Sequence, residues 1–131
     1  MRIISVVETP HLPVTFPGER MNMPLDAELR TLAHNRASAA VDTAAATLRT
    51  DEGSRQLSVT TAVLAGSPKG LILEEADAFV ADLIVVGSHG HGMVERFLLG
   101  SVSQAVALHA RCSVEIVRSL KPPRAKAVGR K

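Results

Sequence analysis

The stretch DLIVVGSHGHGMVERFLLGSVS, residues 82–103, decides which fold this chain is expected to adopt. Its apolar beginning predicts a strand over residues 82–86 that ends on Gly87. More glycines follow, and Gly100 is succeeded at once by Ser101 and a stretch compatible with a helix. Glycine allows a ligand to approach the backbone closely, and the free N–H groups at a helix start attract anions. The pattern predicts a binding site for a phosphate or a nucleotide.

Two familiar glycine motifs do not fit this stretch. A P-loop would need a lysine between glycine and serine, but Gly100 and Ser101 are adjacent. A dinucleotide-binding fingerprint would place its third glycine at Glu95. The remaining pattern is Gly-x2-Gly-x9-Gly-Ser, which runs from Gly87 through Gly90 to Gly100 and Ser101.

With the flanking segments DLIVV and LLGSVS, this spacing resembles the universal stress protein family. The segment HARCSVEIVR, residues 109–118, is similar to the final strand of that family. The resemblance covers residues 2–118 and implies an adenine nucleotide alpha hydrolase-like fold, in which helices lie on both faces of a parallel sheet.

The order of elements along the chain leads to the same fold class. Apolar periodicity predicts helices over residues 26–49, 68–80 and 101–109, and strands over residues 3–7, 57–63, 82–86 and 114–117. Strands that alternate with helices imply parallel crossovers and a doubly wound α/β sheet. The strand over residues 82–86 is apolar on both faces, so it is expected to be covered on both.

The resemblance also implies that the fold is shortened at its N-terminus. Family members begin with a further strand and helix, and an aspartate after that strand helps to hold the nucleotide. This chain begins at what resembles the second strand, and the absent strand would lie between residues 3–7 and 82–86. Three interpretations remain open: a start assigned too far downstream, repacking with a second chain, or direct closure of a shorter sheet.

Charge divides the chain into two parts. Residues 1–118 carry 10 basic and 13 acidic side chains, a net charge of −3, whereas residues 119–131 carry five basic and no acidic side chains. We therefore predict one domain over residues 1–118 and a basic, disordered tail over residues 119–131. The chain has no Trp or Tyr and three Phe, so aromatic platforms for stacking nucleic-acid bases are scarce.

Composition indicates where the protein works. The chain has one cysteine, so no internal disulfide is available and a reducing cytoplasm is expected. The sequence lacks the long apolar run of a membrane span, and no membrane partner is expected.

The resemblance implies a nucleotide site for ATP, with or without Mg²⁺. Backbone amides and hydroxyls of the glycine loop would hold the triphosphate and ribose, with the hydroxyls of Ser101 and Ser103 on phosphate. A residue from the strand over residues 3–7 would lie near the adenine, and Val6 is the candidate. The implied site residues are Val6, Gly87, Ser88, His89, Gly90, Gly100, Ser101, Val102 and Ser103.

No catalytic or metal-binding group is predicted. His89 and His91 flank Gly90, but a metal would need a third ligand, and no Cys or carboxylate lies nearby at a suitable spacing. Ser88 and His89 are adjacent in sequence and lack an orienting acid, so a nucleophile–base pair is not expected.

Two functions remain open. In the first, the protein is a nucleotide-binding regulator of the stress response with little or no turnover; a weak ATPase is a third reading. In the second, it is a homodimeric interaction module that has lost nucleotide binding with the first strand and its aspartate. The resemblance implies a homodimer through the last strand, at Val114, Ile116 and Val117.

Overall fold

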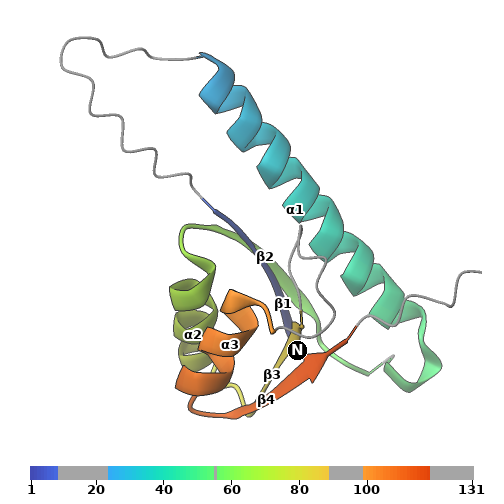
Figure 1. The fold of residues 1–131 in the computed structure, drawn as a ribbon. Helices are drawn as coiled ribbons and strands as arrows, with labels where there is room; N and C mark the ends of the chain where they lie inside the picture. Colours follow the sequence, from blue (N-terminus) through green and yellow to red (C-terminus); the bar gives the residue numbers. More distant parts are fainter. Residues whose placement is uncertain (9–23, 55, 89–98, 119–131) are drawn as a thin grey trace, which may run out of the picture. The chain divides into compact units, whose positions relative to one another are not determined.

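The computed structural model describes residues 1–8, 24–54, 56–88 and 99–118. These residues fall into two compact units, which divide between Glu75 and Ala76. Each unit contains one pair of parallel strands and a helix that follows the first strand of the pair (Figure 1). The predicted tail, residues 119–131, lies outside the described residues, and the single domain over residues 1–118 stays a prediction.

The first unit is built on β1 (Arg2–Val7) and β2 (Thr60–Ala65). The two strands are parallel, with Arg2 opposite Thr60 and Val7 opposite Ala65. The backbone N–H of Thr60 donates to the carbonyl of Met1 at 3.0 Å, which fixes where the pairing begins. β2 therefore begins later than the predicted strand over residues 57–63, because the pairing with β1 sets its bounds.

The helix α1 (Pro24–Thr50) packs against β1 and β2. Its buried residues are Ala37, Val41 and Ala45, which are spaced four residues apart and so share one face. By contrast, Leu29 and Leu32 near its start are 56% and 53% exposed. A helix of 27 residues is about 40 Å long and a six-residue strand about 20 Å. The N-terminal part of α1 therefore extends beyond the strands, as Figure 1 shows.

A 3₁₀ turn over Glu52–Ser54 follows α1, and α2 (Pro68–Ala78) follows β2. The predicted helix over residues 68–80 thus ends two residues early. The N–H of Ala81 donates to the carbonyl of Ala76 at 2.9 Å, and that of Val80 to the carbonyl of Asp77 at 3.1 Å. This pair of bonds is a Schellman C-cap, and it puts Val80 at a φ of 52°. A valine thus occupies the position that glycine usually takes.

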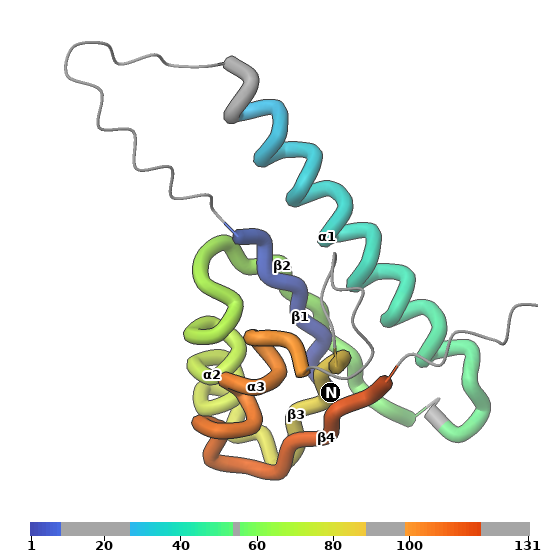
Figure 2. The backbone as a smooth tube through the Cα atoms, viewed as in Figure 1, coloured from blue at the N-terminus to red at the C-terminus, as the bar shows by residue number. Residues whose placement is uncertain are grey.

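The second unit is built on β3 (Leu83–Gly87), α3 (Ser101–His109) and β4 (Ser113–Val117). β3 and β4 are parallel, with Leu83 opposite Ser113 and Gly87 opposite Val117. The buried apolar side chains of these elements are Val106, which is fully buried, and Ile84, which is 8% exposed. The tube in Figure 2 shows the end of β3 approaching the start of α3.

The α/β class with parallel strands and helices is confirmed, and α3 has the predicted bounds. Within the described residues, however, the strands form two separate pairs and not one continuous sheet. The prediction that residues 82–86 are covered on both faces is wrong for these residues, because Leu83 and Val85 are 51% and 57% exposed. A two-stranded sheet with α3 beside it covers alternate side chains of β3 and leaves the others at the surface.

Candidate functional site

The candidate site lies where β3 ends and α3 begins. β3 finishes at Gly87, and the backbone N–H of Ser88 donates to the carbonyl of Val117 at 2.8 Å. This bond continues the pairing with β4 one residue beyond the strand. The sheet therefore sets the position of Ser88, which is 5% exposed.

Two hydrogen bonds join this strand end to the helix start. The N–H of Gly100 donates to the carbonyl of Ser88 at 2.8 Å. The hydroxyl of Ser103 donates to the carbonyl of Gly87. Residues that are 12 and 16 positions apart in the sequence are thus in direct contact. Ser88 and Gly100, which lie on either side of residues 89–98, are therefore held close together. Residues 89–98 themselves lie outside the described residues.

Gly100 is the N-cap of α3. It has extended backbone angles, φ −60° and ψ 150°, and no side chain to cap the helix. The first helical bond runs from the N–H of Gln104 to the carbonyl of Gly100 at 2.9 Å. The N–H groups of residues 101–103 precede that bond, so they have no partner within the helix. With the partial positive charge of the helix dipole, such groups can bind an anion.

The side chains of the first helical turn differ in exposure. Ser101 is exposed, Val102 is intermediate and Ser103 is 4% exposed. The Ser101 hydroxyl therefore lies at the surface beside the N–H groups. The Ser103 hydroxyl is buried and donates its proton to Gly87.

The structure brings together six of the nine residues that the sequence singles out. These are Gly87, Ser88, Gly100, Ser101, Val102 and Ser103. Val6 lies in the first unit, in β1, opposite Leu64, and is not part of these contacts. His89 and Gly90 lie outside the described residues, as does His91. The role of each of the nine in binding stays a prediction.

The bond from Ser103 to Gly87 is the feature of this site that sequence reasoning missed. The available signal was a small hydroxyl residue at the third position of a helix that follows a strand ending in glycine. That signal is weak, because serine at this position usually bonds within its own helix or to solvent.

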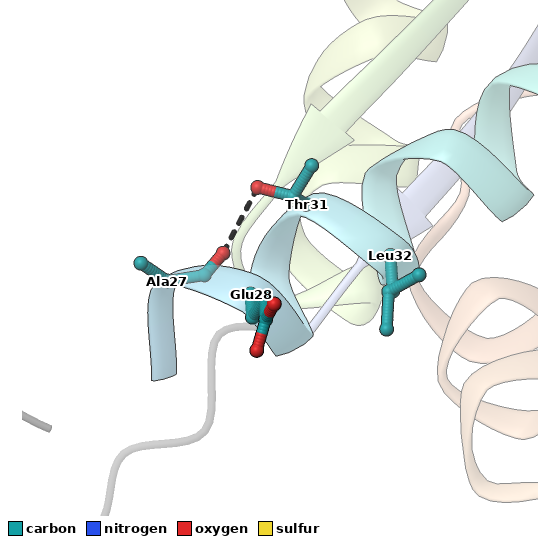
Figure 3. Close-up of a pocket in the computed structure, with 4 residues that line it drawn as sticks. All are labelled: Ala27, Glu28, Thr31 and Leu32. Atoms are coloured by element: carbon teal, nitrogen blue, oxygen red, sulfur yellow. Dashed lines mark hydrogen bonds between the residues drawn. The ribbon is translucent and has the colours of Figure 1, made fainter. Parts of the chain in front are cut away.

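A metal site, a pocket or a membrane-spanning helix elsewhere in the described residues would also bear on function. No three His, Cys, Asp or Glu side chains among them lie close enough together to hold a metal ion. A shallow depression on α1 is lined by Ala27, Glu28, Thr31 and Leu32 (Figure 3). The Thr31 hydroxyl there donates to the carbonyl of Ala27 at 2.9 Å, so it is already occupied by its own helix. In the described ranges, no helix has the length and apolar character needed to cross a membrane.

The family profile of the universal stress proteins matches residues 2–118 of this chain. The chain belongs to the universal stress protein family. The match includes β3, the site and α3, and it ends one residue after β4.

Curated relatives of the same family are similar over a shorter stretch. A putative universal stress protein of Staphylococcus epidermidis is 48% identical over 59 residues, which are 44% of this chain and 36% of that protein. A putative universal stress protein of Staphylococcus haemolyticus is 46% identical over 59 residues, with the same two shares. The matched part spans well under half the length of these relatives.

Solved structures show the same fold. Universal stress protein UspA from Lactobacillus plantarum superposes with a TM-score of 0.65 and 27% identity, over 89% of this chain and 76% of that one. Protein MJ0577 gives a TM-score of 0.61 at 18% identity, over 92% of this chain and 76% of that one. The second likeness concerns the fold alone.

Proposed function

We propose that this universal stress protein binds a nucleotide, ATP with or without Mg²⁺, and acts as a regulator of the stress response with little or no turnover. The observation that supports it most directly is the start of α3, which two hydrogen bonds hold at the end of β3. Membership of the family is the second support. Phosphate oxygens would accept hydrogen bonds from the N–H groups of residues 101–103 and from the exposed hydroxyl of Ser101.

In this proposal the other residues that the sequence singles out complete the site. Gly87, Ser88, His89, Gly90 and Gly100 give the phosphates and ribose access to the backbone, and Val6 lies near the adenine. The proposal includes little or no turnover because the sequence pattern assigns no general base or arginine to the phosphates, and phosphoryl transfer depends on such groups. A cytoplasmic location, suggested by the single cysteine, belongs to the same proposal.

A second function deserves a test because of the sheet edges. Ser113 and Val117 bond to β3 through their backbones, so the backbone groups of Val114 and Ile116 point to the other edge of β4. That edge has no partner strand within the described residues, and an unpaired edge can take up a strand of a second copy. We therefore keep the homodimer through Val114, Ile116 and Val117, in which the glycine loop serves as a scaffold, as the alternative.

Calorimetry with Mg-ATP separates the two functions. The nucleotide-binding proposal expects binding by the wild type and a loss of roughly tenfold or more with Gly100→Val, because a branched side chain would occupy the buried N-cap position. Gly53→Val is the matched control, since a Cβ there would meet nothing closer than an Asp51 carboxylate oxygen at 3.7 Å.

Two further ligands show which part of the nucleotide is bound. Inorganic triphosphate should bind and adenosine should not, if the start of α3 provides most of the affinity. Dimerisation by sedimentation without any binding of Mg-ATP or triphosphate would favour the interaction module. Steady release of phosphate from ATP would show that the weak ATPase is the better description.

A further inference from the structure

Ser103 has an unusual place in the first turn of α3. It is the third helical residue, it is 4% exposed, and its hydroxyl donates to the carbonyl of Gly87, which lies 16 positions earlier. A helical serine or threonine commonly bonds to a carbonyl of its own helix, as Thr31, Thr43 and Thr47 do in α1. The Ser103 hydroxyl instead connects α3 to β3.

This bond limits what Ser103 can offer to a ligand. A serine hydroxyl has one proton to donate, and here the proton goes to a backbone carbonyl. The lone pairs that remain on its oxygen would repel the oxygens of a phosphate. Ser101 is different, because its side chain is exposed on the same helical turn. The two serines, which the sequence pattern treats alike, are therefore in different chemical situations.

The bond also has a structural consequence. The N–H of Gly100 donates to the carbonyl of Ser88 just before the helix, and Ser103 donates to the carbonyl of Gly87 one turn into it. Two attachments on neighbouring residues of the strand end fix both the place and the rotation of the first turn. The three N–H groups between them are then held in a set direction before any ligand arrives.

We propose that Ser103 is a positioning residue, which orients the N–H groups of residues 101–103 for a phosphate group and does not contact the phosphate itself. This inference rests on the proposed nucleotide binding and deepens it, since it separates a contacting serine, Ser101, from a positioning one. Its physical basis is preorganisation. Ordering the helix start in advance removes a cost that binding would otherwise carry.

The first part of the test uses the ligand-free protein and amide hydrogen exchange followed by NMR. The reporters are the N–H groups of Gly100 and Gln104, whose hydrogen bonds belong to the attached helix start. Ser103→Ala should raise their exchange rates by roughly tenfold, the equivalent of one hydrogen bond. Ser103→Thr, which keeps the hydroxyl, should restore slow exchange, and Ser101→Ala should leave it unchanged.

The second part measures the affinity of the same variants for Mg-ATP by calorimetry. Both Ser103→Ala and Ser101→Ala should bind several-fold more weakly, and Ser103→Thr should recover most of the loss. The distinguishing result is the combination: Ser103→Ala alters exchange and affinity together, whereas Ser101→Ala alters affinity alone. If Ser103→Ala does not fold, Ser103→Cys, of similar size and a much weaker donor, takes its place.

Unchanged exchange in Ser103→Ala with weakened binding would mean that Ser103 contacts the ligand, and the inference would be overturned. Raised exchange with unchanged binding would overturn it as well, because the attachment would then serve the fold alone. Failure of the wild type to bind Mg-ATP or inorganic triphosphate would instead refute the proposed function, and the binding role of Ser103 with it. The exchange rates would still report whether the attachment exists.

Discussion

The two units use the same strand–helix–strand plan in different ways. In the first, β1 is followed by the 27-residue helix α1, whose buried alanines and valine cover the β1–β2 pair. In the second, β3 is followed by the nine-residue helix α3, whose first turn is bonded to the end of β3. At the end of β1, the carbonyl of Val7 accepts from the N–H of Gly66 at 2.9 Å, a residue that follows β2. Parallel pairing alone therefore does not bond the end of a strand to the start of the helix that follows it.

What distinguishes the second unit is the connection between a strand end and a helix N-terminus. The carbonyls of Gly87 and Ser88 are both occupied by groups from the start of α3. N–H groups that have no partner within their own helix therefore lie at a helix start that is bonded to a strand end. The comparison predicts that changes in the first turn of α3 affect ligand binding, and that changes in the core of α3 and around β2 and α2 affect stability.

The largest expected effect comes from the core of the second unit. Val106 is fully buried, so Val106→Asp would put an unpaired charge among apolar groups and should lower the free energy of unfolding by about 3–5 kcal/mol. Urea denaturation followed by far-UV circular dichroism measures this. Leu108→Asp is the control on the same helix, because Leu108 is 70% exposed, and it should change stability little. A small effect of Val106→Asp would mean that α3 is not packed as described.

The turn from β2 to α2 tests the first unit. Gly66 has a φ of +148°, and a Cβ there would lie 2.9 Å from Cδ1 of Leu71. Gly66→Ala should therefore cost about 1–3 kcal/mol of stability. Gly70→Ala, four residues later, should stabilise by about 0.5–1 kcal/mol, because its Cβ meets nothing closer than 3.9 Å and alanine favours a helix. Thermal unfolding of the two variants should shift in opposite directions, and equal shifts would contradict the described turn.

A substitution in the C-cap of α2 should have a smaller effect, and it should stabilise the protein. Val80 is 85% exposed and has a φ of 52°, a conformation in which a branched side chain is strained. Val80→Gly should raise the free energy of unfolding by about 1 kcal/mol, since glycine adopts this conformation without strain. Val80→Ala keeps the Cβ and should gain less. A loss of stability in Val80→Gly, measured by urea denaturation, would show that the side chain is needed there.

Two ion pairs give the smallest effects. Nη2 of Arg2 lies 3.0 Å from Oε2 of Glu75, and these side chains are 36% and 25% exposed. Nη1 of Arg111 lies 3.5 Å from Oδ2 of Asp77, and these side chains are 84% and 49% exposed. Glu75→Gln should cost about 0.5–1 kcal/mol at low salt, and the cost should shrink as salt is added. Asp77→Asn should have no measurable effect on unfolding by urea. Equal costs for the two variants would mean that exposure does not separate the pairs.

Much of the second unit could be predicted from the sequence. The bounds of α3 agree with the expected helix over residues 101–109, and β3 is displaced by one residue from the expected strand. These elements are marked locally, by an apolar run that ends in glycine and by a glycine directly before the helix. Local signals of this kind need no knowledge of distant contacts.

Features that depend on distant residues could not be predicted. The bond from Ser103 to Gly87 joins positions 16 residues apart, and the start of β2 is set by its pairing with Met1 and Arg2. The exposure of Leu83 and Val85 could not be predicted either. An apolar run suggests a buried strand, but it does not show how many strands and helices lie beside it. The left-handed Val80 was missed because its residue type argues against that conformation.

The most direct test of the account is an NMR titration of the amide groups with Mg-ATP. It predicts that the amide signals of Ser101, Val102 and Ser103 shift strongly, that inorganic triphosphate reproduces these shifts, and that the signals of Leu29 and Leu32 near the start of α1 do not change. Saturating ligand without any change at residues 101–103, or shifts confined to other parts of the chain, would contradict it.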